Sequence, residues 1–253
     1  MVTPLLYTRL VASFPAGVSP AAVDAVIDLA RALGAELQAL LLEDLAALAM
    51  AGMPSPRTFD PRVSLWRDLQ PTEMQRELDL AAALLRRRLE AAQRAGLHAQ
   101  LTVARGGPGS VLGQYAQTGD LLVVTEPADP MARWVQPFTA LLEAALAAPA
   151  AVLYLPHRGA RGSGPIAYFG AGVAAALARR MAQALGAPCV DAEAGQHAAR
   201  TRSLHALLAQ LAERRVRVVV CDRSALGAHP SRTLQEAGDR RLAVLLAPAQ
   251  EAA

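Results

Sequence analysis

The residues best suited to chemistry in this sequence form a glycine-rich turn, Gly106 to Ser110, ahead of a helix predicted over 110–118. Glycine has no Cβ, so its backbone N–H can approach an anion closely, and the first turn of a helix favours negative charge. Gly107, Gly109 and Ser110 therefore form a candidate anion site. An ordinary tight turn with Ser110 as the N-cap explains the same residues, and we favour it because no Lys follows, as a phosphate loop requires.

Two further residues would join such a site. Thr125 ends a strand predicted over 120–125, and Arg133 lies in the loop that follows it. Ligands of doubly wound sheets bind outside the carboxyl ends of the strands, which is the side where the glycine turn also lies. If a nucleotide or other anion binds, we expect it to contact Gly107, Gly109, Ser110, Thr125 and Arg133.

The remaining reactive residues show no spacing typical of catalysis or metal binding. No two histidines are four residues apart, and none has a cysteine at metal-site spacing. No Gly-x-Ser-x-Gly elbow occurs, so nucleophilic catalysis has no support, and Glu43 and Asp44 are interpreted as a solvated pair. We predict no metal site and no enzyme activity. The histidines are His98, His157, His197, His205 and His229.

Composition excludes several classes of protein. The net charge is +3, and the 25 basic residues are all Arg and evenly spread, which does not predict a nucleic-acid-binding face. No apolar run approaches the roughly 20 residues of a membrane span. Cys189 and Cys221 lie in apolar runs that would be separated by a central strand, so we expect no disulfide. A reduced, cytoplasmic setting is the simplest inference.

Apolar runs alternate with helical periodicity along the chain, which predicts a parallel sheet with right-handed crossovers. Ser19 is placed to cap the first helix and Gly34 to end it, and Thr72 with Gln75 resembles a capping box. Three Arg doublets are expected to close helices, at 179–180, 214–215 and 240–241. The first-half strands are predicted over 5–14, 36–42, 98–104, 120–125 and 150–155, and the helices over 19–33, 72–95, 110–118 and 134–147.

A polar, glycine-rich stretch over 157–164 has the composition of a linker, and a second cycle of strands and helices follows it. The helix, Ala-Leu-Gly-Ala stop and strand of 25–40 recur at 176–191, which favours internal duplication. The second-half strands are predicted over 166–170, 188–192, 216–221 and 242–247, and the helices over 173–185, 203–214 and 230–238.

The connection over 43–71 departs from this rhythm. It contains four prolines and many apolar residues, and such residues either cover a sheet edge or cleft or meet a partner protein. Both interpretations remain open, with covering the edge or cleft preferred. The apolar residues are Leu45, Leu48, Met50, Met53, Phe59, Leu65 and Trp66.

Residues 5–156 resemble the universal stress protein family. The resemblance is carried by the strand, turn and helix opening, by VARGGPGSVLGQYAQTGDLLVV, and by LLEAALAAPAAVLYLP. It implies an α/β fold of two tandem doubly wound parallel sheets, each in 3-2-1-4-5 order. It divides the chain into a domain over 1–156, a linker over 157–164, and a shortened domain over 165–253 that lacks one edge strand.

The ATP-binding members of that family carry an acid after the first strand and a glycine loop after the fourth. Here the first strand ends Ser13-Phe14-Pro15, and the fourth runs into Thr125-Glu126-Pro127, which offers carboxylates and prolines in place of N–H donors. The resemblance therefore implies a scaffold without the family's ATP site and without a cofactor. A protein that binds ATP or AMP through an altered cleft, or a slow ATPase, is the alternative.

For function, the resemblance implies a non-catalytic stress-response or regulatory protein that acts through protein contacts. A structural dimerisation module is a further alternative. In the family the last strands of two protomers commonly pair, so we expect 152–155 to lie near 244–246 within this chain. A homodimer of the whole chain is also compatible with the sequence, and the protein partner is not identified by it.

Overall fold

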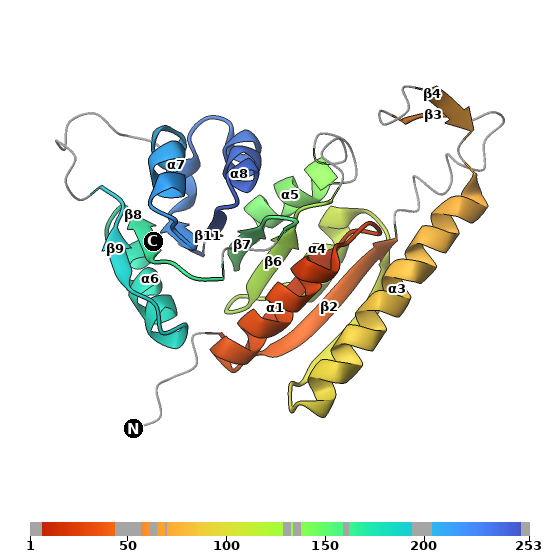
Figure 1. Cartoon of the computed structure of the whole chain (residues 1–253), viewed down its shortest axis with the longest axis horizontal. Coiled ribbons are helices and arrows are strands. Elements are labelled where there is room, and N and C mark those ends of the chain that lie inside the picture. Colours follow the sequence, from red (N-terminus) through yellow and green to blue (C-terminus); the bar gives the residue numbers. More distant parts are fainter. Residues whose placement is uncertain are drawn as a thin grey trace.

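The computed structural model describes residues 7–43, 57–60, 65–68, 70–128, 133, 138–158, 162–193 and 204–248. Nine strands form one mostly parallel sheet in the order β5-β2-β1-β6-β7-β11-β10-β8-β9 (Figure 1). Helices cover both faces of this sheet, which makes the fold α/β and doubly wound, as predicted.

The strands of the large sheet are β1 (Arg9–Phe14), β2 (Glu36–Glu43), β5 (Ala99–Arg105), β6 (Leu121–Thr125), β7 (Ala151–Leu155), β8 (Ile166–Phe169), β9 (Cys189–Asp191), β10 (Val218–Cys221) and β11 (Ala243–Leu246). The helices are α1 (Pro20–Leu33), α3 (Pro71–Arg94), α4 (Pro108–Tyr115), α5 (Phe138–Ala147), α6 (Val173–Ala184), α7 (Leu204–Glu213) and α8 (Pro230–Asp239), with a 3-10 helix η2 (Arg223–Leu226) after β10.

The strand order confirms the predicted topology. The first-half strands run β5-β2-β1-β6-β7, which is the expected 3-2-1-4-5 order, and the second-half strands run β9-β8-β10-β11, the same order without its third strand. The second half can lose this strand because it would lie at an edge, where only one neighbour pairs with it.

The two half-sheets meet through the one antiparallel pair of the large sheet among the described residues. Val244, Leu245 and Leu246 of β11 stand opposite Tyr154, Leu153 and Val152 of β7. This confirms the expected proximity of 152–155 and 244–246, and it makes the sheet continuous through both halves. The domain boundaries at 156 and 165 stay a prediction.

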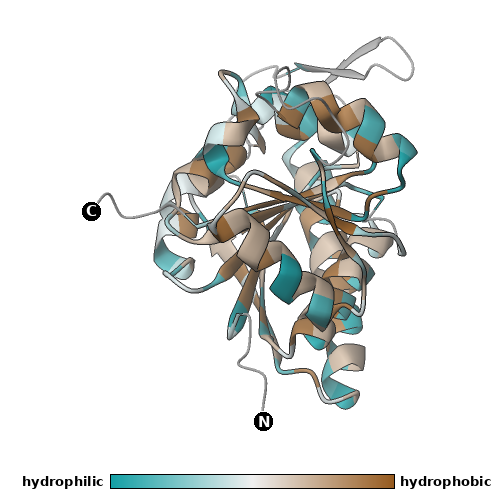
Figure 2. Cartoon of the chain, turned by 90° about the vertical axis from the view of Figure 1, so that its left-hand side faces the viewer, coloured by the Kyte–Doolittle hydropathy of each residue, from teal (hydrophilic) through white to brown (hydrophobic). Residues whose placement is uncertain are grey.

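Each face of the sheet has its own hydrophobic core. One core packs α1, α3 and α6 onto the strands, and Leu85 of α3 and Met181 of α6 are fully buried in it. The other packs α4, α5, α7 and α8. Successive strand residues face opposite cores: in β1, Leu10 and Ala12 belong to the first and Val11 to the second. Figure 2 shows the hydrophobic strands at the centre of the molecule.

Helix starts were predicted with mixed success. Ser19 caps α1, because its Oγ accepts the N–H of Ala22 at 3.1 Å, as predicted. The capping box at Thr72 and Gln75 is wrong: α3 begins at Pro71, and Gln70 is its N-cap without a side-chain hydrogen bond. Ser110 as N-cap of α4 is also wrong, since the helix begins at Pro108 after Gly107. In both cases proline occupies the first helical position, for which its fixed φ is suited.

Other boundaries moved by a few residues. Arg179 and Arg180 lie inside α6 and do not close it, whereas the doublets at 214 and 240 follow α7 and α8 as predicted. The residues 134–137 that were assigned to α5 lie outside the described residues.

The connection over 43–71 contains a hairpin that the sequence analysis did not predict. β3 (Arg57–Asp60) and β4 (Leu65–Asp68) pair antiparallel, with Phe59 opposite Trp66. Figure 1 shows this hairpin beyond the start of α3 and away from the nine-stranded sheet. Leu45, Leu48, Met50 and Met53 lie outside the described residues, so the choice between cover and docking surface stays open for them.

The cysteines are placed as predicted. Cys189 lies on β9 and Cys221 on β10, β8 separates these strands, and both thiols are free. Burial raises the pKa of the Cys221 thiol to about 12, so it remains protonated at neutral pH. In the described part of the chain, no helix is long and apolar enough to cross a membrane.

Candidate functional site

Glu126 is a buried carboxylate directly after β6, where the sheet presents its carboxyl edge. Its side chain is 0% exposed. Oε1 accepts hydrogen bonds from the Tyr154 hydroxyl and from Nη1 of Arg133, each at 2.8 Å. Oε2 accepts the backbone N–H of His157 at 3.1 Å and lies 3.0 Å from Nδ1 of the same residue. Burying a charge is costly unless it is paired and hydrogen-bonded, and Glu126 meets both conditions.

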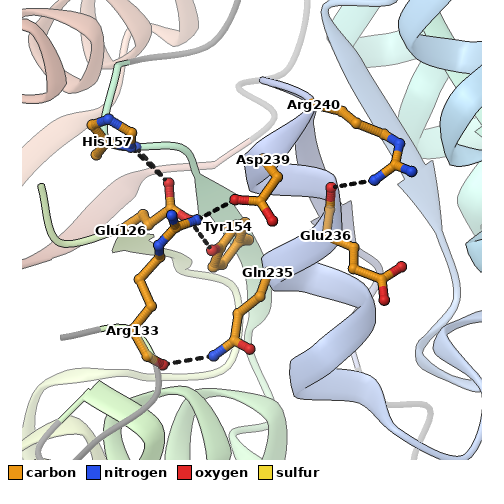
Figure 3. A network of polar contacts seen from close by, with 8 residues as sticks. All are labelled: Glu126, Arg133, Tyr154, His157, Gln235, Glu236, Asp239 and Arg240. Atoms are coloured by element: carbon orange, nitrogen blue, oxygen red, sulfur yellow. Dashed lines mark hydrogen bonds and ion pairs between the residues drawn. The ribbon is translucent and has the colours of Figure 1, made fainter. Parts of the chain in front are cut away.

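Arg133 links Glu126 to the second half of the chain. Its Nη1 also donates to Oδ1 of Asp239 at 2.6 Å, and its backbone carbonyl accepts Nε2 of Gln235 at 2.6 Å. Asp239 and Gln235 both belong to α8. Figure 3 shows Arg133 between Glu126 on one side and the α8 residues on the other. We call Glu126, Arg133, Tyr154, His157, Gln235 and Asp239 the junction network.

The sheet itself places these residues together. Because β11 runs antiparallel to β7, the start of β11 and the end of α8 before it lie at the carboxyl edge of β6 and β7. His157 follows β7, and its backbone carbonyl accepts the hydroxyl of Ser19, the N-cap of α1, at 2.5 Å. The loop after β6, the end of β7, the end of α8 and the start of α1 therefore meet around one carboxylate.

Electrostatics keep Tyr154 protonated and Arg133 charged. Burial raises the pKa of the Tyr154 phenol well above its ordinary value, and the negative charge of Glu126 adds to this shift. The phenol thus remains a donor at neutral pH. Burial alone would lower the pKa of the Arg133 guanidinium, but its hydrogen bond to Asp239 and the charge of Glu126 raise it above the ordinary value. The guanidinium therefore stays charged.

Gly238 allows α8 to approach the junction network closely. A Cβ at this position would lie 2.6 Å from Oε1 of Glu126 and 3.0 Å from the Tyr154 hydroxyl. The first distance is shorter than real Cβ contacts and the second is tighter than most of them, and both neighbouring groups are buried and hydrogen-bonded to each other. Only glycine fits here without displacing them.

A second arginine makes the reciprocal connection. Arg223 follows β10 in the second half, as the Arg133 loop follows β6 in the first. Its Nη2 donates to the carbonyls of Ala148 and Ala150, each at 2.7 Å, and its Nη1 donates to the carbonyl of Leu146. These carbonyls lie at and after the end of α5, where a cation is favoured by the helix dipole. Each half therefore sends one arginine to the end of the other half's last helix.

The predicted site residues make separate contacts in the structure. Thr125 is fully buried, and its hydroxyl donates to the carbonyl of Ser13 at 2.7 Å. Gly107 and Gly109 are exposed at the start of α4, and the Ser110 hydroxyl donates to the carbonyl of Gly107 at 2.9 Å. No hydrogen bond or ion pair of the described residues joins this turn to Thr125 or Arg133. Their role in binding stays a prediction.

The backbone after β6 offers few donors to a phosphate. The N–H of Glu126 donates to the carbonyl of Leu155 at 2.9 Å, and Pro127 has no N–H. The adjacent Glu126 carboxylate adds a negative charge. The described residues directly after β6, 126–128, thus offer a triphosphate little of what the family resemblance would imply.

Glu43 corrects another expectation. It is buried, and its Oε2 accepts Nε of Arg105 at 2.6 Å, so it is not the solvated carboxylate that we predicted. Asp44 lies outside the described residues. Glu43 ends β2 and Arg105 ends β5, which are paired in register, so the charges meet at the carboxyl edge of the first half.

A groove of about 590 Å³ lies at the opposite edge, around the amino ends of β2 and β5. Its polar lining includes Glu36, Gln38, His98 and Arg9. Arg9 is already bound to Asp120, with Nε and Nη2 donating to the two carboxylate oxygens at 3.1 and 2.6 Å. The groove therefore presents amides and a carboxylate rather than a free cation. Within the described residues, no group of three or more acids, histidines or cysteines could hold a metal ion.

The sequence analysis treated Glu126 only as an obstacle to phosphate binding and did not identify its partners. Tyr154 lay inside a predicted strand, and Asp239 lay more than a hundred residues further along the chain. The available indication was an acid directly after an entirely apolar strand, with an arginine in the same loop. Such a pair predicts a buried ion pair, but the sequence does not show which distant helix completes it.

Comparison with solved structures identifies the same architecture. A universal stress protein from Archaeoglobus fulgidus superposes with a TM-score of 0.60 at 13% identity, covering 97% of this chain and 99% of that chain. A Pseudomonas aeruginosa protein assigned as a universal stress protein gives 0.55 at 11% identity, covering 97% and 95%. The cytoplasmic domain of a prokaryotic cation chloride cotransporter gives 0.50 at 12% identity, covering 97% of each.

No protein-family model and no curated protein matches the sequence. The fold and the strand order nevertheless define the class: the chain is a Rossmann-like α/β protein with the universal stress protein fold over nearly its whole length.

We predict that Gly238→Ala lowers the free energy of unfolding by about 2–3 kcal/mol, because the added methyl group must displace Glu126 or Tyr154 from a buried network. Urea denaturation followed by circular dichroism measures the change. Gly113→Ala is the matched control: Gly113 also lies in a helix, nothing lies within 4 Å of its added Cβ, and stability should rise by about 0.5–1 kcal/mol. Equal effects of the two substitutions would contradict the close approach.

Proposed function

We propose that this chain is a non-catalytic regulatory protein of the stress-response type, which acts in the cytoplasm through protein contacts and lacks the ATP site of its fold relatives. The observation that carries the proposal is the junction network. It places a buried carboxylate and a proline at the point where a phosphate loop would follow β6.

Charge and geometry both support this proposal. A triphosphate at the end of β6 would face the negative charge of Glu126, whose partner Arg133 is already shared with Asp239. Releasing Arg133 to bind phosphate would leave Glu126 buried with only Tyr154 and His157 as partners. Breaking a buried ion pair costs about 3–5 kcal/mol, so the network resists that exchange.

The other paired groups at this edge support the same interpretation. Thr125 is bound to Ser13, and Glu43 is bound to Arg105. The first pair joins the carboxyl ends of β6 and β1, and the second joins the carboxyl ends of β2 and β5. Both pairs therefore stabilise the contact between neighbouring strands. The polar groups near the carboxyl edge of the first half are thus used to hold elements together.

Two large apolar side chains of α3 and β5 are exposed to solvent, which favours a contact function. Leu80 on α3 is 62% exposed, and Val103 on β5 is 42% exposed. α3 packs against β5, and β5 is an edge strand of the large sheet. Exposed large apolar side chains next to an unpaired strand edge are typical of surfaces that bind another protein. The cotransporter's cytoplasmic domain is an instance of this fold as one part of a larger assembly.

Added ATP should not change the hydrogen exchange of the backbone at the carboxyl edge of the first half of the sheet. In hydrogen–deuterium exchange with ATP or AMP at about 1 mM, we expect no added protection over residues 105–112 or 121–128, because the N–H of Glu126 is engaged by Leu155, Pro127 has none, and no second donor group of the described residues joins the α4 turn. Protection of both peptides, lost in Arg133→Ala, would contradict the proposal and favour the alternative of a nucleotide-binding protein or slow ATPase. The measurement is local, so binding elsewhere in the chain does not affect its outcome.

Leu80→Arg should abolish a specific partner contact. We expect in-cell crosslinking with mass spectrometry to recover at least one protein, or a second copy of the chain, whose yield falls at least about fivefold in Leu80→Arg. Ala83→Arg is the matched control, since Ala83 is exposed on the same helix and lacks the apolar side chain. Recovery of an identical set of crosslinked proteins from both variants would argue against this surface.

A further inference from the structure

The turn between β8 and α6 has a glycine-rich sequence that the proposed function does not use. β8 ends at Phe169, α6 begins at Val173, and Gly170-Ala171-Gly172 connects them. Both glycines have positive φ angles, 91° at Gly170 and 67° at Gly172, which side-chain-bearing residues rarely adopt. With Ala175 the stretch reads Gly-x-Gly-x-x-Ala between a strand and a helix.

This is the dinucleotide-binding fingerprint in its required structural context. In such units the first glycine permits the tight turn, the second lets the backbone approach a pyrophosphate, and the third small residue lets the helix pack on the strand. Here a Cβ on Gly172 would meet nothing within 4 Å, so the space above the turn is open. Ala175 is buried, and α6 packs on β8 and β10.

The acidic residue of the fingerprint is also present. It is expected about 20 residues after the glycines, at the end of the next parallel strand, where it binds a ribose 2′-hydroxyl. Asp191 is the last residue of β9, and β9 pairs parallel with β8 so that Asp191 stands opposite Tyr168. One carboxylate oxygen, Oδ1, accepts the N–H of Glu193 at 2.9 Å. The other has no hydrogen-bond partner in the described part of the chain.

The two halves differ in how their carboxyl edges are used. In the first half the edge is closed by Glu126 with Arg133 and by Glu43 with Arg105. The second half has no such pair among the described residues at the ends of β8 and β9. A second carboxylate, Asp222, lies beside the turn, with Oδ2 3.8 Å from the Cβ position of Gly170. Its charge opposes a pyrophosphate at the turn, as Glu126 does in the first half, but here the first-turn N–H groups of α6 lie on the same side.

We propose that the β8-α6-β9 unit binds the adenosine diphosphate part of a dinucleotide that has a free ribose 2′-hydroxyl, with NAD⁺ as the probe. The backbone N–H groups at Gly172 and the first turn of α6 face the pyrophosphate, and Asp191 accepts the ribose hydroxyls. This goes beyond the proposed function, which concerns the other half of the chain, and neither proposal depends on the other.

Calorimetric titration of the full chain with NAD⁺ tests the site. We expect saturable binding in the range of about 10 µM to 1 mM, and at least about tenfold weaker binding of NADP⁺, because its 2′-phosphate meets the Asp191 carboxylate. No saturable heat up to about 5 mM NAD⁺, or equal affinity for the two dinucleotides, would overturn the proposal.

Three substitutions separate binding from structure. Asp191→Asn should weaken NAD⁺ about tenfold and reduce its preference over NADP⁺. Asp222→Asn should strengthen NAD⁺ about threefold by removing the charge beside the turn. Glu193→Gln is the control, since it removes a nearby exposed carboxylate and should leave affinity unchanged. All three change half-buried or exposed residues, and circular dichroism confirms their folding. Equal responses to all three would show general charge effects and contradict the site.

Discussion

The structure depends on one buried charge, the carboxylate of Glu126, which must be neutralised where it lies. It is fully enclosed at the end of β6, and its partners come from four parts of the chain: the loop that contains Arg133, strand β7 with Tyr154, the residue His157, and, through Arg133, helix α8. An uncompensated carboxylate in this position would cost several kcal/mol, so Arg133 must stay beside it, and α8 holds Arg133 there through Asp239 and Gln235.

The halves are joined by two unlike kinds of interaction. The antiparallel pairing of β7 with β11 makes one continuous hydrophobic sheet. This pairing does not by itself make the contact between the halves specific, because backbone hydrogen bonds and apolar residues tolerate many sequences. Two arginines make the contact between the halves specific. Arg133 reaches the end of α8, and Arg223 reaches the end of α5, so each half fixes the position of the other's last helix. The 53% exposure of Asp239 means that its pair with Arg133 contributes less than the buried pair with Glu126.

The strands of the large sheet were predicted well because they follow from patterns of residues that are neighbours in the sequence. Apolar runs that end at glycine or proline located the strands of the large sheet, and the family resemblance supplied their order and the meeting of β7 with β11. Helix starts failed at Pro71 and Pro108, where proline at the first helical position takes precedence over a side-chain cap downstream. The hairpin at Phe59 and Trp66 was missed because its strands are only four residues long and are flanked by prolines. Glu126 was noticed only as an obstacle to phosphate binding, and its partners were not predicted, because tertiary packing brings Arg133, Tyr154 and His157 to it.

A double-mutant cycle on Glu126→Gln and Arg133→Met tests the central claim most directly. Urea unfolding of the wild type, the two single variants and the double variant gives the coupling energy between the side chains. A buried, shared ion pair predicts a favourable coupling of about 1–3 kcal/mol, with the double variant clearly more stable than the sum of the single losses implies. Additive losses, with a coupling energy near zero, would show that the two charges do not depend on one another and would contradict the account.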